Sequence, residues 1–238
     1  MRYLLLLIIL IGCKQNSSTR FKTIDLKVFS LQVPNNWNYH EQRGIDSFVG
    51  MIKGPGIEIE FDYSEFGYAS NLVETESEYL ENRLWMPLCT FCEPGIIYTT
   101  GNIEGTIEAE KKKRPASDTS DIIVRRHPEP TVEIKKIADS LRNNEVTDHY
   151  MATLTYNGKE VYVPIELPEE ITNHTISIDT IDRYILRKVK PNSVGNGLTG
   201  VYYEELEGSF NFNIYAYNLD EQNQVAFLEA IETLVLTR

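Results

Sequence analysis

The sequence has little positive charge, and this shortage excludes several classes of partner. Twenty-three Lys and Arg stand against 35 Asp and Glu, which gives a formal net charge of -12 and a pI near 4.9. Binding to nucleic acid needs basic side chains on the phosphates, and docking on anionic lipid needs the same charge. We therefore expect no nucleic-acid partner and no electrostatic attachment to a membrane surface.

Familiar catalytic motifs are also missing. The sequence contains no Gly-x-Ser-x-Gly, no His-Glu-x-x-His and no calcium-binding loop. Its four histidines, His40, His127, His149 and His174, are far apart in the chain and are interpreted as surface or loop residues. We expect no catalytic residue, no cofactor and no metal site, so an enzyme is not favoured.

The chain also lacks an apolar run long enough to span a bilayer, which takes about 20 residues. Its first apolar run, Leu4–Ile11, is much shorter and follows the single positive charge of Arg2. A short positive region followed by a short apolar run is typical of a secretion signal. The sequence therefore predicts export rather than a membrane-spanning helix.

The residues that end this signal, Leu10-Ile11-Gly12-Cys13, resemble the lipobox of bacterial lipoproteins at all four positions. The resemblance implies that the Cys13 thiol receives a diacylglycerol and that the chain is cleaved before Cys13. It also implies that the new amine receives a fatty acid such as palmitate. Lipid contributes about 0.8 kcal/mol per buried CH₂, so two or more acyl chains anchor stably. An ordinary signal peptide with a chance cysteine is the alternative.

These residues set the expected organisation of the chain. We expect a lipoprotein signal peptide at 1–12, a lipidated Cys13 with a polar tether over 13–23, and a globular domain over 24–238 with an elaborated middle at about 85–180. The lipid on Cys13 would attach the protein to a membrane. Because Lys14 is not the acidic residue linked to inner-membrane retention, the expected location is the outer membrane of a bacterial cell envelope.

The hydrophobic pattern predicts an α+β domain, with an antiparallel sheet flanked by helices and a C-terminal amphipathic helix. Asn157-Gly158 between alternating apolar runs is a strong hairpin signal. Val225, Leu228, Ile231 and Val235 form the expected buried stripe of the C-terminal helix. The remaining predicted elements are strands at 29–33, 47–53, 57–63, 96–100, 103–109, 184–189 and 210–217, helices at 75–84 and 132–141, and an exposed loop at 110–121.

Two stretches together resemble a group of uncharacterised lipoproteins of the Bacteroidetes. One runs from Phe29 to Trp37 and continues through the segment 44–50 and Phe61-Asp62-Tyr63, and the other runs from Gly197 to the terminal helix. More distantly, they resemble the fold of the photosystem II extrinsic protein PsbP, in which an antiparallel sheet lies between helices. This group has no assigned chemistry, so the resemblance implies no site residues.

The sharpest chemical feature is Cys89-Thr90-Phe91-Cys92. Such a pair can be a structural disulfide, free or metal-bound thiols, or a thiol–disulfide redox site. The flanking Pro87 and Pro94 indicate a loop rather than a helix N-terminus, which favours a structural disulfide. No further Cys or His pair at ligand spacing completes a zinc site.

A second motif, Gly195-x-Gly197-x-x-Gly200, matches the glycine pattern of dinucleotide-binding loops. The residues after it favour a strand instead of the required helix, so a turn between strands is predicted. The expected function is a non-catalytic envelope lipoprotein that binds or scaffolds an unknown envelope protein or ligand. The alternative is a secreted thiol–disulfide oxidoreductase that uses Cys89 and Cys92.

Overall fold

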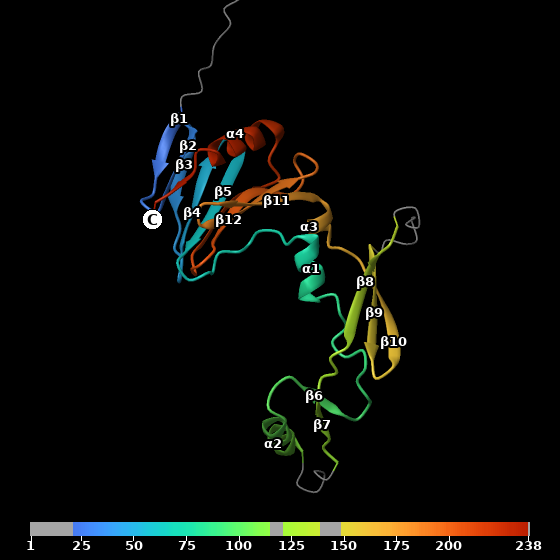
Figure 1. Cartoon of the computed structure of the whole chain (residues 1–238). Coiled ribbons are helices and arrows are strands. Elements are labelled where there is room, and N and C mark those ends of the chain that lie inside the picture. The colour runs from blue at the N-terminus through green and yellow to red at the C-terminus, as the bar shows by residue number, and fades with distance from the viewer. Residues whose placement is uncertain (1–20, 115–120, 139–148, 238) are drawn as a thin grey trace, which may run out of the picture. The chain divides into compact units, whose positions relative to one another are not determined.

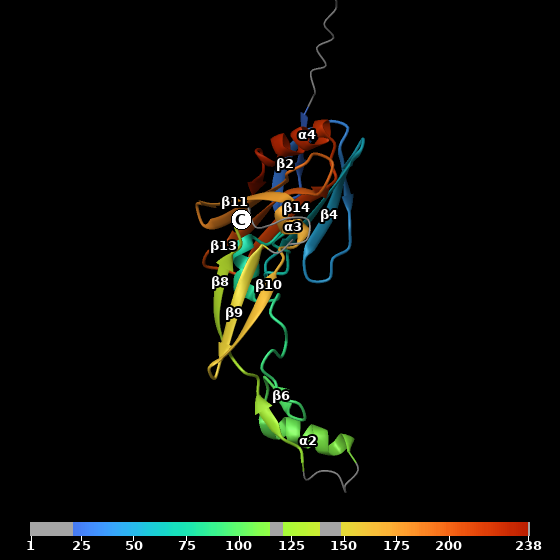
Figure 2. The same cartoon turned by 90° about the vertical axis from the view of Figure 1, so that its right-hand side faces the viewer.

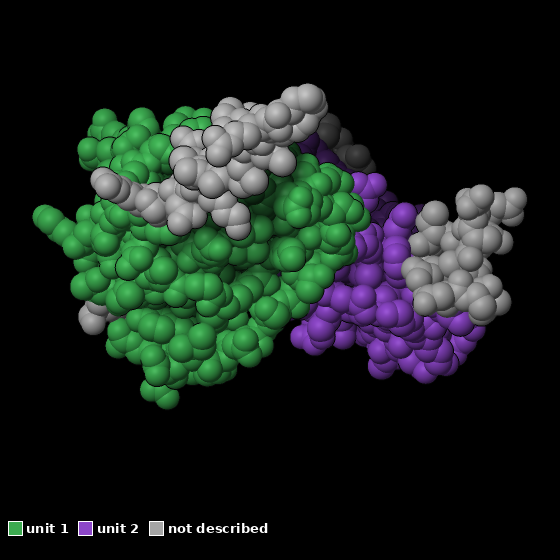
Figure 3. Space-filling view, turned by 90° about the horizontal axis from the view of Figure 1, so that it is seen from above, with its two compact units in different colours: residues 1–72, 173–238 green, residues 73–172 purple. Residues whose placement is uncertain are grey.

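The structure is a computed structural model that describes residues 21–114, 121–138 and 149–237. Cys13, the signal peptide and most of the tether lie outside these residues, so the lipidation prediction stays a prediction. The chain divides into two compact units, coloured separately in Figure 3. Unit 1 comprises 1–72 and 173–238, and unit 2 comprises 73–172. In the described residues, no helix combines the length and the apolar character needed to cross a membrane.

In its described residues, unit 1 is built from two antiparallel sheets and one helix (Figure 1). The larger sheet has seven strands, in the order β11 (His174–Ile181), β12 (Tyr184–Pro191), β13 (Leu198–Glu205), β14 (Asn211–Tyr217), β5 (Ile57–Ser64), β4 (Phe48–Gly54) and β3 (Asn38–Glu41). The smaller sheet has the order β1 (Phe21–Asp25), β2 (Phe29–Pro34) and β15 (Val235–Leu236), and the helix is α4 (Glu221–Ile231).

The core of unit 1 forms because its strands alternate apolar and polar residues. In β5, Ile57, Ile59 and Phe61 are buried while Glu58 and Glu60 between them are exposed. Phe29 of β2 lies against Phe61 and against Phe212 of β14, with ring centroids 4.9 Å apart in both pairs. These aromatic contacts join the smaller sheet to the larger one.

Helix α4 packs on β2 and β13 within unit 1 (Figure 1). Its buried residues are Gln224, Phe227, Ala230 and Ile231, whereas Val225 is 51% exposed. The predicted stripe was therefore wrong at Val225, and also at Val235, which is 58% exposed and lies in β15 rather than in the helix. Gln224 is polar yet buried, and its amide donates to the buried Thr199 hydroxyl at 3.0 Å. This hydrogen bond offsets the cost of removing the amide from water.

The part of unit 2 that the structure describes has a three-stranded antiparallel sheet, a short parallel pair and three helices (Figure 2). The sheet order is β10 (Lys159–Ile165), β9 (Tyr150–Tyr156) and β8 (Thr131–Lys136), and the parallel pair is β6 (Ile97–Thr99) with β7 (Val124–Arg126). The helices are α1 (Glu76–Asn82), α2 (Ile103–Lys113) and α3 (Glu169–Thr172). Helix α2 connects β6 to β7.

Local signals predicted some of these elements correctly. The β9–β10 hairpin turns at Asn157 and Gly158, which have φ angles of 49° and 74°. Both angles lie in the left-handed region that such a turn requires, so the Asn-Gly prediction is confirmed. Thr75 caps α1, because its side chain accepts from Glu78 N while the Glu78 carboxylate accepts from Thr75 N.

The predicted fold class is wrong. Strands make up 45% of the structure and helices 16%, and the helices are short, so the protein is β-rich rather than an α+β sheet flanked by helices. The chain does not finish in α4 either, because β15 follows it and pairs with β2. Of the segment predicted as a helix at 132–141, residues 132–136 belong to strand β8, and residues 139–141 lie outside the described residues. The segment predicted as a strand at 103–109 is part of α2.

Candidate functional site

Three side chains with metal-binding and redox chemistry come together in unit 2. The Sγ atoms of Cys89 and Cys92 and a ring nitrogen of His127 all lie within 4.8 Å of one another. We call this group the cysteine–histidine cluster. Cys89 is exposed, and the other two residues are partly buried. The cluster is therefore reachable from solvent.

The two cysteines lie in a turn that follows α1. The helix ends at Asn82, and Arg83 adopts a left-handed conformation that redirects the chain. Cys89 and Cys92 are joined as a disulfide with their Cα atoms 5.2 Å apart, and Cys92 N donates to Cys89 O at 3.4 Å. No helix begins at Cys89, so the pair has no helix dipole of the kind that activates thioredoxin-type cysteines.

Phe91, between the two cysteines, fixes this turn on the core of unit 2. It packs against the cluster of buried residues from β9 and β10, and its ring centroid lies 5.7 Å from that of Tyr156. Trp85 and Met86, just before the turn, pack against the same core. Trp85, Met86 and Phe91 therefore face this core, whereas Leu88 and Cys89 lie at the surface.

His127 directly follows β7, and several contacts tie its segment to the cysteine turn. The Tyr98 ring lies 5.7 Å from the His127 ring, while the Tyr98 hydroxyl accepts from Glu93 N at 3.0 Å. Arg125 forms an ion pair with Glu93 at 3.2 Å. The turn and the histidine are thus held by the same small set of residues.

Within the cluster, Cys89 Sγ lies 3.8 Å from His127 Nδ1. With the disulfide closed, the sulfurs offer only weak acceptor capacity to the ring. With the disulfide reduced, an imidazolium beside a thiol favours the thiolate, and a neutral imidazole beside two thiolates is a set of metal ligands. The arrangement therefore supports structural, redox and metal-binding chemistry, depending on its oxidation state.

A groove of about 650 Å³ lies beside Cys92 in unit 2. One wall is the cysteine turn from Thr90 to Pro94, and the other is the β9–β10 hairpin around Tyr156 and Lys159. Cys92 and Phe91 therefore border a space in which a polypeptide segment or a small molecule can lie.

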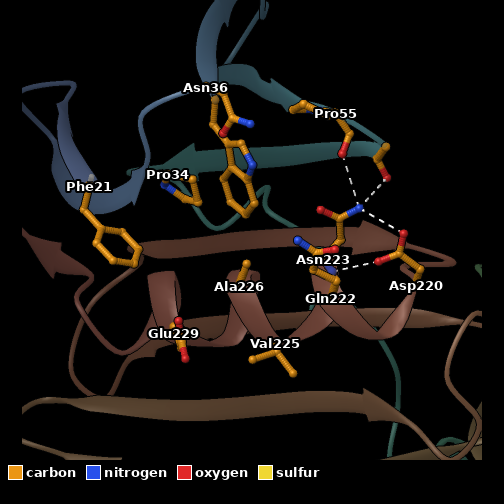
Figure 4. Close-up of a pocket in the computed structure, with 12 residues that line it drawn as sticks. Phe21, Pro34, Asn36, Pro55, Asp220, Gln222, Asn223, Val225, Ala226 and Glu229 are labelled. Atoms are coloured by element: carbon orange, nitrogen blue, oxygen red, sulfur yellow. Dashed lines mark hydrogen bonds between the residues drawn. The ribbon is translucent and has the colours of Figure 1, made fainter. Parts of the chain in front are cut away.

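A second groove, of about 450 Å³, lies over α4 in unit 1 (Figure 4). Two of its polar side chains, Asp220 and Asn223, are already engaged with each other and with the backbone. The Asn223 amide donates to the carbonyl oxygens of Pro55 and Gly56 and to Asp220, whose other carboxylate oxygen accepts from Asn223 N (Figure 4). These bonds hold the β4–β5 turn against the start of α4. They explain why an aspartate and an asparagine occupy positions 220 and 223, so no ligand is needed to explain them.

The other histidines lie apart from the cluster. His40 is exposed on β3, His149 Nδ1 accepts from Leu167 N at 3.1 Å, and His174 Nε2 accepts from Leu198 N at 2.8 Å. Each of the last two has a structural role in its own segment. Sequence reasoning treated all four histidines alike and so missed that His127 differs from the rest.

The glycine motif is a turn between β12 and β13, as predicted. Gly200 lies within β13, so no helix follows the motif to hold a phosphate. At Gly197, with a φ of 125°, a Cβ atom would lie 2.5 Å from the His174 ring. The glycine is thus explained by local packing.

The comparisons with known proteins add no assignment, because no family model matches the chain and no curated protein matches it. The resemblance to Bacteroidetes lipoproteins and to PsbP stays a prediction. The function therefore has to be argued from the residues themselves.

Proposed function

We propose that the protein is a lipid-anchored component of the bacterial cell envelope that acts by binding or scaffolding rather than by catalysis. The observation that carries this proposal is the lipobox Leu10-Ile11-Gly12-Cys13 after a short apolar run. Lipid on Cys13 holds the folded chain at a membrane without a spanning helix. The acidic surface of the chain does not supply that attachment by charge.

The start of unit 1 supports a short tether. Strand β1 begins at Phe21, so residues 14–20 separate it from Cys13. Seven extended residues reach about 25 Å at 3.3–3.6 Å each. An anchor on Cys13 therefore keeps unit 1 close to the membrane, where it can meet other envelope components.

The α4 groove supports binding in preference to catalysis at that place. Its carboxylate Asp220 caps a helix, and its amide Asn223 is bonded to two backbone carbonyls. Groups committed to the fold in this way do not form a set of acid, base and nucleophile. Instead, the groove provides a concave surface with apolar side chains, Phe21 and Val225, that a binding partner can contact.

Metabolic labelling with a fatty-acid probe tests the anchor. We expect label on the parent chain and on Cys89→Ser/Cys92→Ser, which keeps the acceptor thiol of Cys13, and none on Cys13→Ala. The matched cysteine variant excludes labelling of the other thiols. Equal labelling of Cys13→Ala would show that the lipid is not on Cys13.

A second candidate function is thiol–disulfide exchange at Cys89 and Cys92. The observation in its favour is His127 Nδ1 at 3.8 Å from the exposed Cys89 sulfur, since an imidazolium there stabilises a thiolate. In the exchange, the Cys89 thiolate attacks a substrate disulfide and expels one substrate thiolate. Cys92 then resolves the mixed disulfide, so the substrate is reduced and the pair is oxidised.

Insulin reduction with the full chain and a dithiol electron donor separates the two functions. The non-catalytic proposal predicts equal rates for the parent and Cys89→Ser/Cys92→Ser. Activity that is lost in the double variant and lowered in His127→Ala would favour the oxidoreductase.

A further inference from the structure

We propose that, when the disulfide is reduced, Cys89, Cys92 and His127 bind a thiophilic divalent metal ion, namely Zn²⁺. This inference goes beyond the proposed function and does not depend on the anchor at Cys13. It rests on three side chains whose ligand atoms lie within 4.8 Å of one another.

The donor types fit zinc. Cys thiolates and His imidazoles are its preferred ligands, and a Cys-x-x-Cys pair is a usual ligand spacing. Two thiolates balance the charge of one divalent ion, so the site needs no further carboxylate. The nearby Glu93 and Arg125 pair with each other at 3.2 Å and add no net charge.

The spacing fits as well. Zinc lies about 2.3 Å from sulfur and about 2.0 Å from nitrogen in a tetrahedral site. This geometry places a sulfur and a nitrogen ligand about 3.5 Å apart, and two sulfurs about 3.8 Å apart. The Cys89 Sγ to His127 Nδ1 separation is 3.8 Å. The two sulfurs have to move apart, by side-chain rotation, after their bond is broken.

His127 is held in place for this role by residues on both sides of the site. Parallel pairing of β7 with β6 fixes the backbone before His127, and Ile97 N donates to Ile123 O at 2.9 Å. Tyr98 contacts the His127 ring and also accepts a bond from Glu93, just after Cys92. A preformed ligand lowers the entropy cost of binding the ion.

Three protein ligands leave one tetrahedral position open. Zinc sites of this composition hold a water or an external ligand in the fourth position. Cys89 is exposed, so such a ligand can reach the ion from solvent. The site is thus suited to a metal ion that stays in contact with solvent.

The oxidation state controls the site because a disulfide has no thiolate to donate. Reduction by a dithiol breaks the Cys89–Cys92 bond, joins the two sulfurs of the dithiol, and leaves one proton on each cysteine sulfur. Binding of Zn²⁺ then displaces these two protons to solvent. Affinity therefore rises with pH, and the disulfide form does not bind.

Titration with Co²⁺, which reports thiolate ligation by absorption, tests the site directly. The full chain with Cys13→Ala is used in detergent, so that Cys89 and Cys92 are its only cysteines. A phosphine reduces the disulfide, taking up an oxygen from water to become its oxide, and is then removed without oxygen. We expect one Co²⁺ per chain with a thiolate-to-cobalt charge-transfer band and tetrahedral visible bands, displaced by Zn²⁺ and missing from the oxidised chain.

The histidine is tested by matched variants. His127→Ala should weaken metal binding by about 100-fold or more, since loss of even an outer-shell partner costs 10–100-fold. His40→Ala, which removes an exposed histidine of unit 1, should bind like the parent. Equal affinities of His127→Ala and His40→Ala would overturn the assignment of His127.

A measurement on the parent alone covers the case in which His127→Ala does not fold. X-ray absorption at the zinc edge of the reduced, zinc-loaded chain should show two sulfur ligands and the outer scattering of one imidazole. Absence of a thiolate band with Co²⁺, or of the imidazole signal with Zn²⁺, would overturn the proposal.

Discussion

The buried face of α4 gives the sharpest test of how unit 1 is packed. Phe227 is completely buried in the core, whereas Val225, two residues earlier, is 51% exposed. The hydrophobic pattern alone places Val225 on the buried stripe and leaves Phe227 off it. The sequence and the structure therefore predict opposite orders for the two alanine substitutions.

The magnitudes follow from burial. Fully burying a Phe side chain stabilises by about 1.5–3 kcal/mol through transfer from water, and the cavity left by its removal adds to the loss. Phe227→Ala should therefore lower the free energy of unfolding by about 3–5 kcal/mol. Val225→Ala removes a side chain that is half in solvent and should change it by about 0.5 kcal/mol at most.

Tryptophan fluorescence can follow unit 1 by itself. The chain has two tryptophans, Trp37 in the core of unit 1 and Trp85 in unit 2. In a Trp85→Phe background, the fluorescence change during urea unfolding reports Trp37 alone. If Phe227→Ala unfolds at the same urea concentration as Val225→Ala, α4 does not pack on the face that the structure shows.

Two further predictions use the same readout. Asp220→Ala should cost unit 1 about 1 kcal/mol, because its carboxylate caps α4 by accepting from Asn223 N at 2.8 Å, while Gln222→Ala on the exposed side should cost little. Burial is the larger cause that raises the pKa of Tyr215, and the hydrogen bond to Glu60 raises it further. Above about pH 10 the phenol therefore ionises in the unfolded chain while it stays neutral in the folded chain. The stability of unit 1 should therefore fall as the pH rises above about 10, and Tyr215→Phe should make that fall less steep; an equal slope in the variant would contradict the assignment.

Features that depend on neighbouring residues could be predicted from the sequence. The hairpin at Asn157-Gly158 needs only left-handed backbone at two adjacent positions, which those residue types adopt readily. The cap at Thr75 needs only Glu78 one turn later. In each case the residues that decide the structure are contiguous, so no knowledge of the rest of the fold is required.

Segments decided by partners far along the chain were predicted wrongly. Strand β8 forms because Val132 and Ile134 lie opposite Leu154 and Ala152 of β9 and pack against that core. The alternation over so short a segment does not distinguish this strand from a helix. Pairing with β9 decides the outcome, and β9 lies beyond the segment itself.

Helix α2 shows the opposite kind of error. The local sequence signals for a helix were present, but the strand propensity of its isoleucines was given more weight in the prediction. Its isoleucines, Ile103 and Ile107, favour a strand by propensity. Asn102 caps the helix by accepting from Gly105 N at 3.2 Å, and the lysines at 111–113 lie at the end where the helix dipole favours positive charge. The helix has no fully buried residue, so capping and charge contribute to its stability beside its contacts with β7.

Because of the same error, the cysteine–histidine cluster could not be predicted from the sequence. A parallel pair such as β6 and β7 requires a crossover, and here the crossover is α2. With 103–109 taken as a strand, nothing brought the chain back to place His127 beside Cys89. The contact also depends on Tyr98, which joins the cysteine turn through Glu93 and His127 through its ring. A search for ligand spacing fails in such a case, because a tertiary crossover sets the distance between the ligands.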